Sequence, residues 1–193
     1  SKQFLIQDSA SAEEMLKRDI VNAISDKLEA TILGSAAGSA TMPAGIFNGV
    51  TPETKDITYK RLVDMETALE EANVAGNKCF IVSPSAKGIL KTTAKDALYN
   101  VTDGGVHTCV GCAGCLMEEN EVNGYPVYCT SNVTSKGVVM GHFEDFVIGQ
   151  WGGIDLTVDP YTQAANGKVR LVINAYFDAK PRRTGSFQKA ILK

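Results

Sequence analysis

Residues 141–183 read GHFEDFVIGQWGGIDLTVDPYTQAANGKVRLVINAYFDAKPRR, and no other part of the chain says as much about its architecture. Three runs, at 145–150, 154–158 and 168–177, predict β-strands. The longest alternates cleanly, with one face made by Val169, Leu171, Ile173, Ala175 and Phe177 and the other by Arg170, Val172, Asn174 and Tyr176. Because the second face is partly apolar, we expect it to be covered from elsewhere, for example by another subunit. None of the runs carries residues arranged for bond-making chemistry, which favours a protein that builds a structure.

Composition limits the classes of protein to which the chain can belong. Its 193 residues, 44% hydrophobic and 21% charged, are enough for one or two domains with a real core. A formal net charge of −3 implies no overall nucleic-acid-binding surface, although Lys180, Arg182 and Arg183 form a local basic group. No apolar run approaches the ~20 residues that span a bilayer, and the first nine residues do not resemble a signal peptide. Since the chain starts without Met, we expect a fragment, a processed product or a trimmed version.

The strongest helix prediction covers residues 11–33. Ser11 and Glu14 have the spacing of a capping box, and Gly34 is a plausible C-cap. One apolar stripe recurs every fourth residue, at Leu16, Ile20, Ile24, Leu28 and Ile32. At 1.5 Å per residue this helix measures roughly 34 Å, which predicts a spine crossing the molecule.

The remaining elements predict a mixed α+β protein, with helices early and strands late. A loop rich in Gly, Ala and Ser occupies 34–49, and a second amphipathic helix is expected at 58–74. The residues of that helix expected to face the core are Tyr59, Leu62, Val63, Leu69 and Ala72. After it we expect a short apolar strand at 77–83, a helix opened by Ser83-Pro84 and running to about Leu90, and strands at 125–130 and 138–141.

The five cysteines include one conspicuous motif. Two CxxC steps share their middle cysteine, with a histidine just upstream, in the set His107, Cys109, Cys112 and Cys115. Thiolates at this spacing can hold zinc or an iron–sulfur cluster. No second pair of cysteines follows at the distance of a typical zinc site, so a glycine-rich loop with free thiols is the preferred interpretation and no metal is assigned. Cys79 and Cys129 lie in apolar runs and are expected to be buried and inert, in a reducing compartment.

Other residues that could carry chemistry are more simply explained by structure. His142 lies between Gly141 and Phe143 and is expected to be structural. A weak cation site at Asp155, Asp159 and Asp178 is conceivable, but surface solubility is the preferred role. The single tryptophan, Trp151, is expected in the core or at an interface. We therefore assign no catalytic, cofactor-binding or metal-binding residue.

Six segments, taken in order, resemble the tailed-bacteriophage major capsid proteins of the Hong Kong 97-like fold. Each is weak alone, but together they cover nearly the whole chain: Phe4–Ser9, Met42–Asn48, Cys79–Pro84, Gly124–Val127, Gly141–Asp145 and Val169–Arg183. The resemblance implies two lobes. Residues 1–44 and 154–193 would form a peripheral lobe with the spine helix and the late strands, and residues 45–153 would form an axial lobe.

The resemblance also implies the function. Copies would form pentamers and hexamers of an icosahedral head around DNA, in a virion assembled in the bacterial cytoplasm. The chain would bind copies of itself, and portal, scaffold or protease proteins are further possible partners. Enzyme activity, sequence-specific nucleic-acid binding and membrane binding are not expected. Members of the family usually carry an N-terminal arm and an extended hairpin loop before the spine helix; we expect neither in this sequence, so no cross-linking residue is assigned.

The expected interface residues are Trp151, the polar face of the 11–33 helix and the loop at 103–115. Two other functions stay open at this point. One is a small metal-binding or iron–sulfur redox protein built around the cysteine motif. The other is a bacterial nanocompartment shell of the same fold, which the genes for portal, protease and terminase beside it would exclude.

Overall fold

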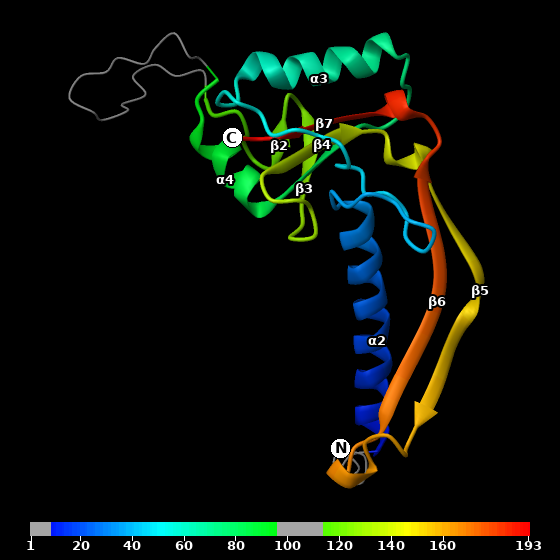
Figure 1. Cartoon of the computed structure of the whole chain (residues 1–193). Coiled ribbons are helices and arrows are strands. Elements are labelled where there is room, and N and C mark those ends of the chain that lie inside the picture. The colour runs from blue at the N-terminus through cyan, green and yellow to red at the C-terminus, as the bar shows by residue number, and fades with distance from the viewer. Residues whose placement is uncertain (1–8, 96–113) are drawn as a thin grey trace. The chain divides into compact units, whose positions relative to one another are not determined.

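The computed structural model describes residues 9–95 and 114–193 and divides the chain into two compact units (Figure 1). Unit 1 takes in the described residues up to Ala30 together with Ile148–Ala179. Unit 2 takes in the described residues of Thr31–Val147 and of Lys180–Lys193. These bounds differ from those of the two lobes expected from the sequence, 1–44 with 154–193 and 45–153, and the assignment of lobes stays a prediction.

Helices and strands are mixed along the chain, which confirms the α+β class. In chain order the helices and strands of the described residues are α2 (Ser9–Ile32), α3 (Tyr59–Glu71), β1 (Cys79–Val82), α4 (Pro84–Thr92), β2 (Glu121–Val122), β3 (Tyr125–Cys129), β4 (Gly137–Gly141), β5 (Phe146–Asp159), β6 (Arg170–Pro181) and β7 (Phe187–Ile191). Short 3-10 turns lie at Phe143–Asp145, Ala164–Asn166 and Thr184–Ser186.

Unit 2 is built on a five-stranded sheet with the strand order β2-β3-β1-β4-β7, of which Figure 1 labels all strands but β1. β1 is parallel to β3 and antiparallel to β4, so that Phe80 lies opposite both Val127 and Met140. β7 closes the other side, antiparallel to β4, with Val138 opposite Ala190. The strand β7 was not predicted from the sequence, in which the last expected strand ended at residue 177.

Both faces of this sheet carry a hydrophobic core. On one face the buried side chains of the sheet pack with those of α3 and α4, in a cluster that includes Leu62, Met65, Leu69, Phe80, Val82, Leu90, Val138 and Met140. On the other face the cluster consists of Leu33, Ile46, Phe47, Val133, Val139 and Phe187. Val138 and Val139 belong to opposite clusters, as the period-two geometry of a strand requires.

Local sequence explains where α3 and α4 begin. The Ser83 hydroxyl accepts a hydrogen bond from the backbone N–H of Ala86 at 3.2 Å, and proline occupies the first turn of α4, so this predicted helix start is confirmed. Thr58 caps α3 in the same way, through the N–H of Arg61 at 3.4 Å.

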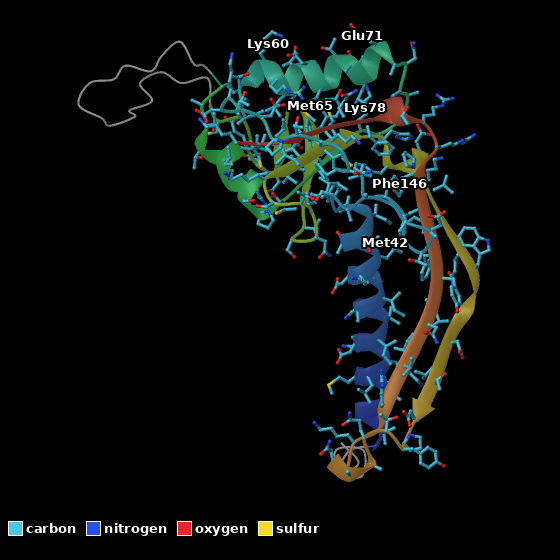
Figure 2. The ribbon with its side chains drawn as sticks, viewed as in Figure 1. Met42, Lys60, Met65, Glu71, Lys78 and Phe146 are labelled. Carbon is cyan, nitrogen blue, oxygen red and sulfur yellow. The ribbon has the colours of Figure 1, made fainter. Side chains whose placement is uncertain are left out.

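The buried face of α3 was predicted only in part. Leu62 and Leu69 are buried as expected, but so is Met65, which was missed. Tyr59 is 40% exposed in the first turn, and Ala72 is exposed beyond the last turn, so both were wrongly assigned to the core. Figure 2 shows Met65 pointing from α3 toward the sheet, while the side chains of Lys60 and Glu71 point away from it.

The predicted loop at 34–49 folds back on the end of α2. The carbonyl of Ile32 accepts from the N–H of Ile46 at 2.7 Å, and that of Gly34 accepts from the N–H of Phe47 at 3.1 Å. A Cβ atom on Gly45 would stand 2.2 Å from the Gly34 oxygen, so only glycine fits at position 45. This close return of the backbone carries the Phe47 side chain into full burial.

Unit 1 consists of α2 up to Ala30 and most of a two-stranded ribbon, β5 with β6. The long helix predicted at 11–33 is confirmed, and Leu16, Ile20, Ile24 and Leu28 of its stripe are half-buried. The two strands predicted at 145–150 and 154–158 are in fact the single strand β5. Glycine lets the strand continue through the break in its pattern, because Gly152 adopts a φ of 73° that other residues rarely adopt.

Candidate interaction surface

Unit 1 buries very little of itself. Among its residues whose side chains the structure describes, only Ala179 is buried, whereas all the other buried residues belong to unit 2. The apolar stripe of α2 reaches only half-burial. A two-stranded ribbon is marginally stable in water unless its apolar face packs against something else. Most apolar side chains of unit 1 are therefore left half-buried or exposed.

The missing contacts are concentrated on β5. Five apolar side chains of this strand within unit 1 are each between 50% and 60% exposed: Ile148, Trp151, Ile154, Leu156 and Val158. We call these five side chains the ribbon surface. In β6, Tyr176 is 68% exposed and Leu171 39%. Large exposed apolar patches are uncommon on proteins that stay monomeric, and where they occur they mark sites of association.

The expected alternation of β6 largely agrees with the observed burial. On the face expected to be buried, four side chains are half-buried: Val169, Ile173, Ala175 and Phe177. On the other face, three are exposed: Arg170, Asn174 and Tyr176. Two residues differ from the expectation, because Leu171 is exposed and Val172 is half-buried. The more apolar face of β6 is thus turned inward within unit 1, and Tyr176 remains on the exposed face.

Trp151 does not lie in the core. Its side chain is 60% exposed, so of the two roles expected for it only the interface role remains, as a prediction. The indole ring lies over Gly149, two residues earlier on the same face of β5, where an added Cβ atom would come within 3.0 Å of the ring. One side of the indole thus packs on the strand that carries it.

The turn between β5 and β6 is held by Asp159. Its carboxylate accepts hydrogen bonds from the Thr162 hydroxyl, from the N–H of Thr162 at 3.1 Å and from the N–H of Tyr161 at 2.9 Å. The bonds from Thr162 are the main cause that lowers the pKa of Asp159. In this turn Tyr161 is 84% exposed. Within the residues described, no three His, Cys, Asp or Glu side chains gather as metal ligands do, and the suggested set Asp155, Asp159 and Asp178 is accordingly not brought together.

Most of the cysteine motif lies outside the described residues, including His107, Cys109 and Cys112, as does the expected interface loop from 103 to 113. Cys115 is described: it is half-buried, and its backbone N–H donates to Glu118 Oε1 at 3.0 Å. The metal interpretation of the motif is therefore untested.

The remaining residues singled out from the sequence have structural surroundings. His142 Nδ1 lies 2.9 Å from the carbonyl oxygen of Asn77, which agrees with a structural role. Cys79 is half-buried, and burial raises its pKa. Cys129 is exposed, so the expectation that it is buried was wrong: it ends β3, beyond the two residues that pair with β2. Lys180, Arg182 and Arg183 are all exposed.

A hollow of about 570 Å³ opens on unit 2, lined by Tyr59, Lys95, Glu118, Glu119, Glu121, Asn123 and Gly124. Lys95 Nζ lies 4.0 Å from Glu118 Oε1. Its lining by the described residues contains carboxylates and a lysine, and among these residues no Ser, Thr, Cys or His that could act as a nucleophile or shuttle a proton at neutral pH. In the described part of the chain, α2 and the other helices are all too short or too polar to cross a membrane.

Two comparisons by sequence match phage capsid proteins. A model of the phage capsid family matches residues 1–190. The major capsid protein of Halomonas phage phiHAP-1 is 27% identical over 190 residues, which is 95% of this chain and 29% of that protein. The chain thus spans less than a third of the length of this curated relative.

Solved structures share the fold. A chain from the capsid of an empty GTA particle gives a TM-score of 0.65 at 16% identity, with 100% of this chain and 69% of that chain covered. A chain of Gordonia phage Cozz gives 0.61 at 16% identity, covering 99% and 66%. An encapsulin complex from Synechococcus elongatus gives 0.54 at 12% identity, covering 90% and 63%. At such identities the similarity concerns the fold alone.

Proposed function

Because this chain belongs to the phage capsid family, we propose that it is the shell-forming part of a phage major capsid protein, a structural subunit that performs no catalysis. The resemblance drawn from six sequence segments is confirmed, and so is the Hong Kong 97-like fold that it implied. The proposal goes further than the family. It holds that copies of the chain associate into pentamers and hexamers, and that these tile a closed icosahedral head around DNA in the virion.

The ribbon surface is the observation that carries this proposal. Covering the exposed half of one aliphatic side chain gains about 1 kcal/mol, so the five side chains together offer about 5 kcal/mol. Association itself costs at least about 4 kcal/mol in lost freedom of motion. One such contact between two copies is therefore weak. A closed ring, in which every copy makes two contacts, is stable where a pair is not.

Charge is compatible with a shell that encloses nucleic acid. Affinity for DNA comes mainly from Lys and Arg side chains that neutralise phosphates. A chain with a net charge of −3 and one small basic group at Lys180, Arg182 and Arg183 encloses DNA without binding it tightly. Assembly would take place in the bacterial cytoplasm, with portal, scaffold and protease proteins as further partners.

The two alternative functions have less support. The encapsulin similarity is one of fold, which phage capsids share, whereas the curated relative is a phage major capsid protein. Portal, protease and terminase genes beside the gene for this chain would exclude the nanocompartment. For the metal or redox protein, no observation on the described residues favours a metal site.

The proposal is tested by assembly of the purified protein. Sedimentation velocity and negative-stain electron microscopy are run over a hundredfold range of protein concentration. We expect monomers at the lowest concentrations and rings or closed shells at the highest, with a steep dependence on concentration. A protein that remains monomeric throughout that range contradicts the proposed function.

A further inference from the structure

We infer that Trp151 is the anchor of the contact between copies of this chain, and that the ribbon surface around it is the patch that a second copy covers. This inference rests on the proposed function and specifies the site that would perform it. The sequence left the role of Trp151 open between core and interface, and its 60% exposure removes the core.

The indole is already oriented for such a contact. It lies over Gly149 on its own strand, where even a methyl group would approach the ring to 3.0 Å. The strand thus supports one side of the ring, while the exposed remainder is free to meet a partner. Tryptophan loses little conformational freedom on binding, since only two side-chain angles are fixed, and a ring held in place beforehand loses still less. Residues of this kind are the usual centres of binding energy in protein interfaces.

The ribbon surface has the composition of an interface core, with Ile148 on the opposite face of the strand from Trp151, three residues away. From Ile148 to Val158 it extends about 33 Å along β5. The exposed parts of its five side chains amount to roughly 300–400 Å². Even with Ile148 included, that is only about half of the ~800 Å² that each partner contributes to a standard interface, so further surface must take part in the contact. Interface cores are rich in aromatic residues and poor in charged ones.

Charge indicates what kind of partner the patch fits. Between Ile148 and Val158 the sequence holds a single charged side chain, Asp155, so nothing there matches a nucleic acid. An apolar strand of this kind fits another protein surface. In a shell, every subunit is surrounded by further copies of the same chain, so a second copy is the partner that is always present. In a symmetric assembly each copy uses the same surface for the same contact.

The chain provides its own probe, because Trp151 is its only tryptophan. Intrinsic fluorescence is recorded across the same concentration series as sedimentation. We expect the emission maximum to move to shorter wavelengths, and quenching by acrylamide to fall, in step with assembly. If rings or shells form while emission and quenching stay those of an exposed indole, the inference about Trp151 is wrong and the proposed function survives. That outcome would also be expected if a different protein covered the patch.

Two glycine variants test whether the position of the Trp151 ring, and not only its presence, matters for assembly. Gly149→Ala places a methyl group against the indole, whereas a Cβ atom on Gly153 has no heavy atom within 4 Å, so Gly153→Ala is the matched control. Both glycines lie in β5 without the left-handed backbone of Gly152. We expect Gly149→Ala to raise the concentration needed for half-assembly and Gly153→Ala to leave it within about twofold. Equal effects of the two substitutions would overturn the inference.

Removal of the side chain gives the magnitude. Trp151→Ala is expected to raise the apparent dissociation constant of the contact about 30-fold, the change typical of an interface anchor. Its thermal unfolding is measured alongside, and is expected to change little because the indole is mostly exposed in the single copy. An unchanged assembly curve for a normally folded Trp151→Ala protein contradicts the inference.

Discussion

Two cysteines show how much the surroundings of one residue depend on its position in a sheet. Cys79 begins β1, where it pairs with Gly141 of β4, and is half-buried. Cys129 ends β3, where it pairs with Val82 of β1, and its side chain is exposed. Both lie in similar apolar runs of the sequence. Each pairs with one neighbouring strand, so their different exposure depends on what packs over the sheet, which the local sequence does not reveal.

This difference predicts unequal thiol reactivity. The thiolate is the reactive form, and burial raises the pKa of Cys79, so less of it is ionised at any given pH. We expect iodoacetamide to modify Cys129 well before Cys79 at pH 8. Modification of Cys79 should become rapid only at a higher pH than an ordinary thiol needs for the same reaction. Peptide mass spectrometry over a time course at several pH values measures this. Faster labelling of Cys79 in the folded protein would contradict the description of both sites.

Among the elements, the loop at 34–49 shows that a short segment can depend on one contact. Its return onto the end of α2 requires the Gly34 carbonyl to pass close to Gly45, and two hydrogen bonds then fix Ile46 and Phe47. Phe47 is fully buried against the sheet. The segment 42–48 was one of those on which the family resemblance relied. The close approach of the backbone at Gly45 to that at Gly34 explains why this segment contains a glycine at position 45.

A pair of glycine substitutions tests this explanation. We expect Gly45→Ala to lower the free energy of unfolding by about 2–3 kcal/mol, because its methyl group cannot occupy the space held by the Gly34 oxygen. Gly88→Ala is the contrasting variant. It lies within α4 with nothing near its Cβ position, so it should raise the free energy of unfolding by up to about 1 kcal/mol. Urea unfolding monitored by circular dichroism measures both, and equal effects of the two changes would argue against a special role for Gly45.

At the scale of the whole molecule, burial is divided very unequally between the two units. Unit 2 has a core on each face of its sheet. Unit 1, in the part whose side chains are described, buries only Ala179 and exposes the ribbon surface. A subunit of this kind gains most by association in the unit that is least complete alone.

Hydrogen exchange should report this division. In the unassembled protein we expect the amides of β1 and β4 to exchange slowest and those of β5 and β6 to exchange much faster, since local stability follows buried contacts. On assembly, protection should increase mainly in β5. Mass spectrometry of peptides from both states measures it, with β4 as the internal reference. Uniform protection across the two units in the single copy would contradict this account of unit 1.

Much of the fold was accessible from the local pattern of residues. The apolar stripe of α2, the Ser83-Pro84 start of α4 and the alternation of β6 are all signals between near neighbours, and each predicted its element. One of the ordered segments that led to the family, 42–48, contains a constraint of this kind in the close approach of Gly45 to Gly34.

Other features became visible only in the tertiary structure. β7 was missed and β5 was divided in two, because strand pairing and continuity depend on partners far away in the chain. The exposure of Trp151 and Cys129 could not be predicted, since an apolar residue is covered or uncovered by whatever packs beside it. A short pattern of residues specifies a helix or a strand, because its hydrogen bonds and side-chain spacing are local. Burial is a property of three-dimensional packing, and the surface on which the proposed assembly depends is defined by what that packing leaves uncovered.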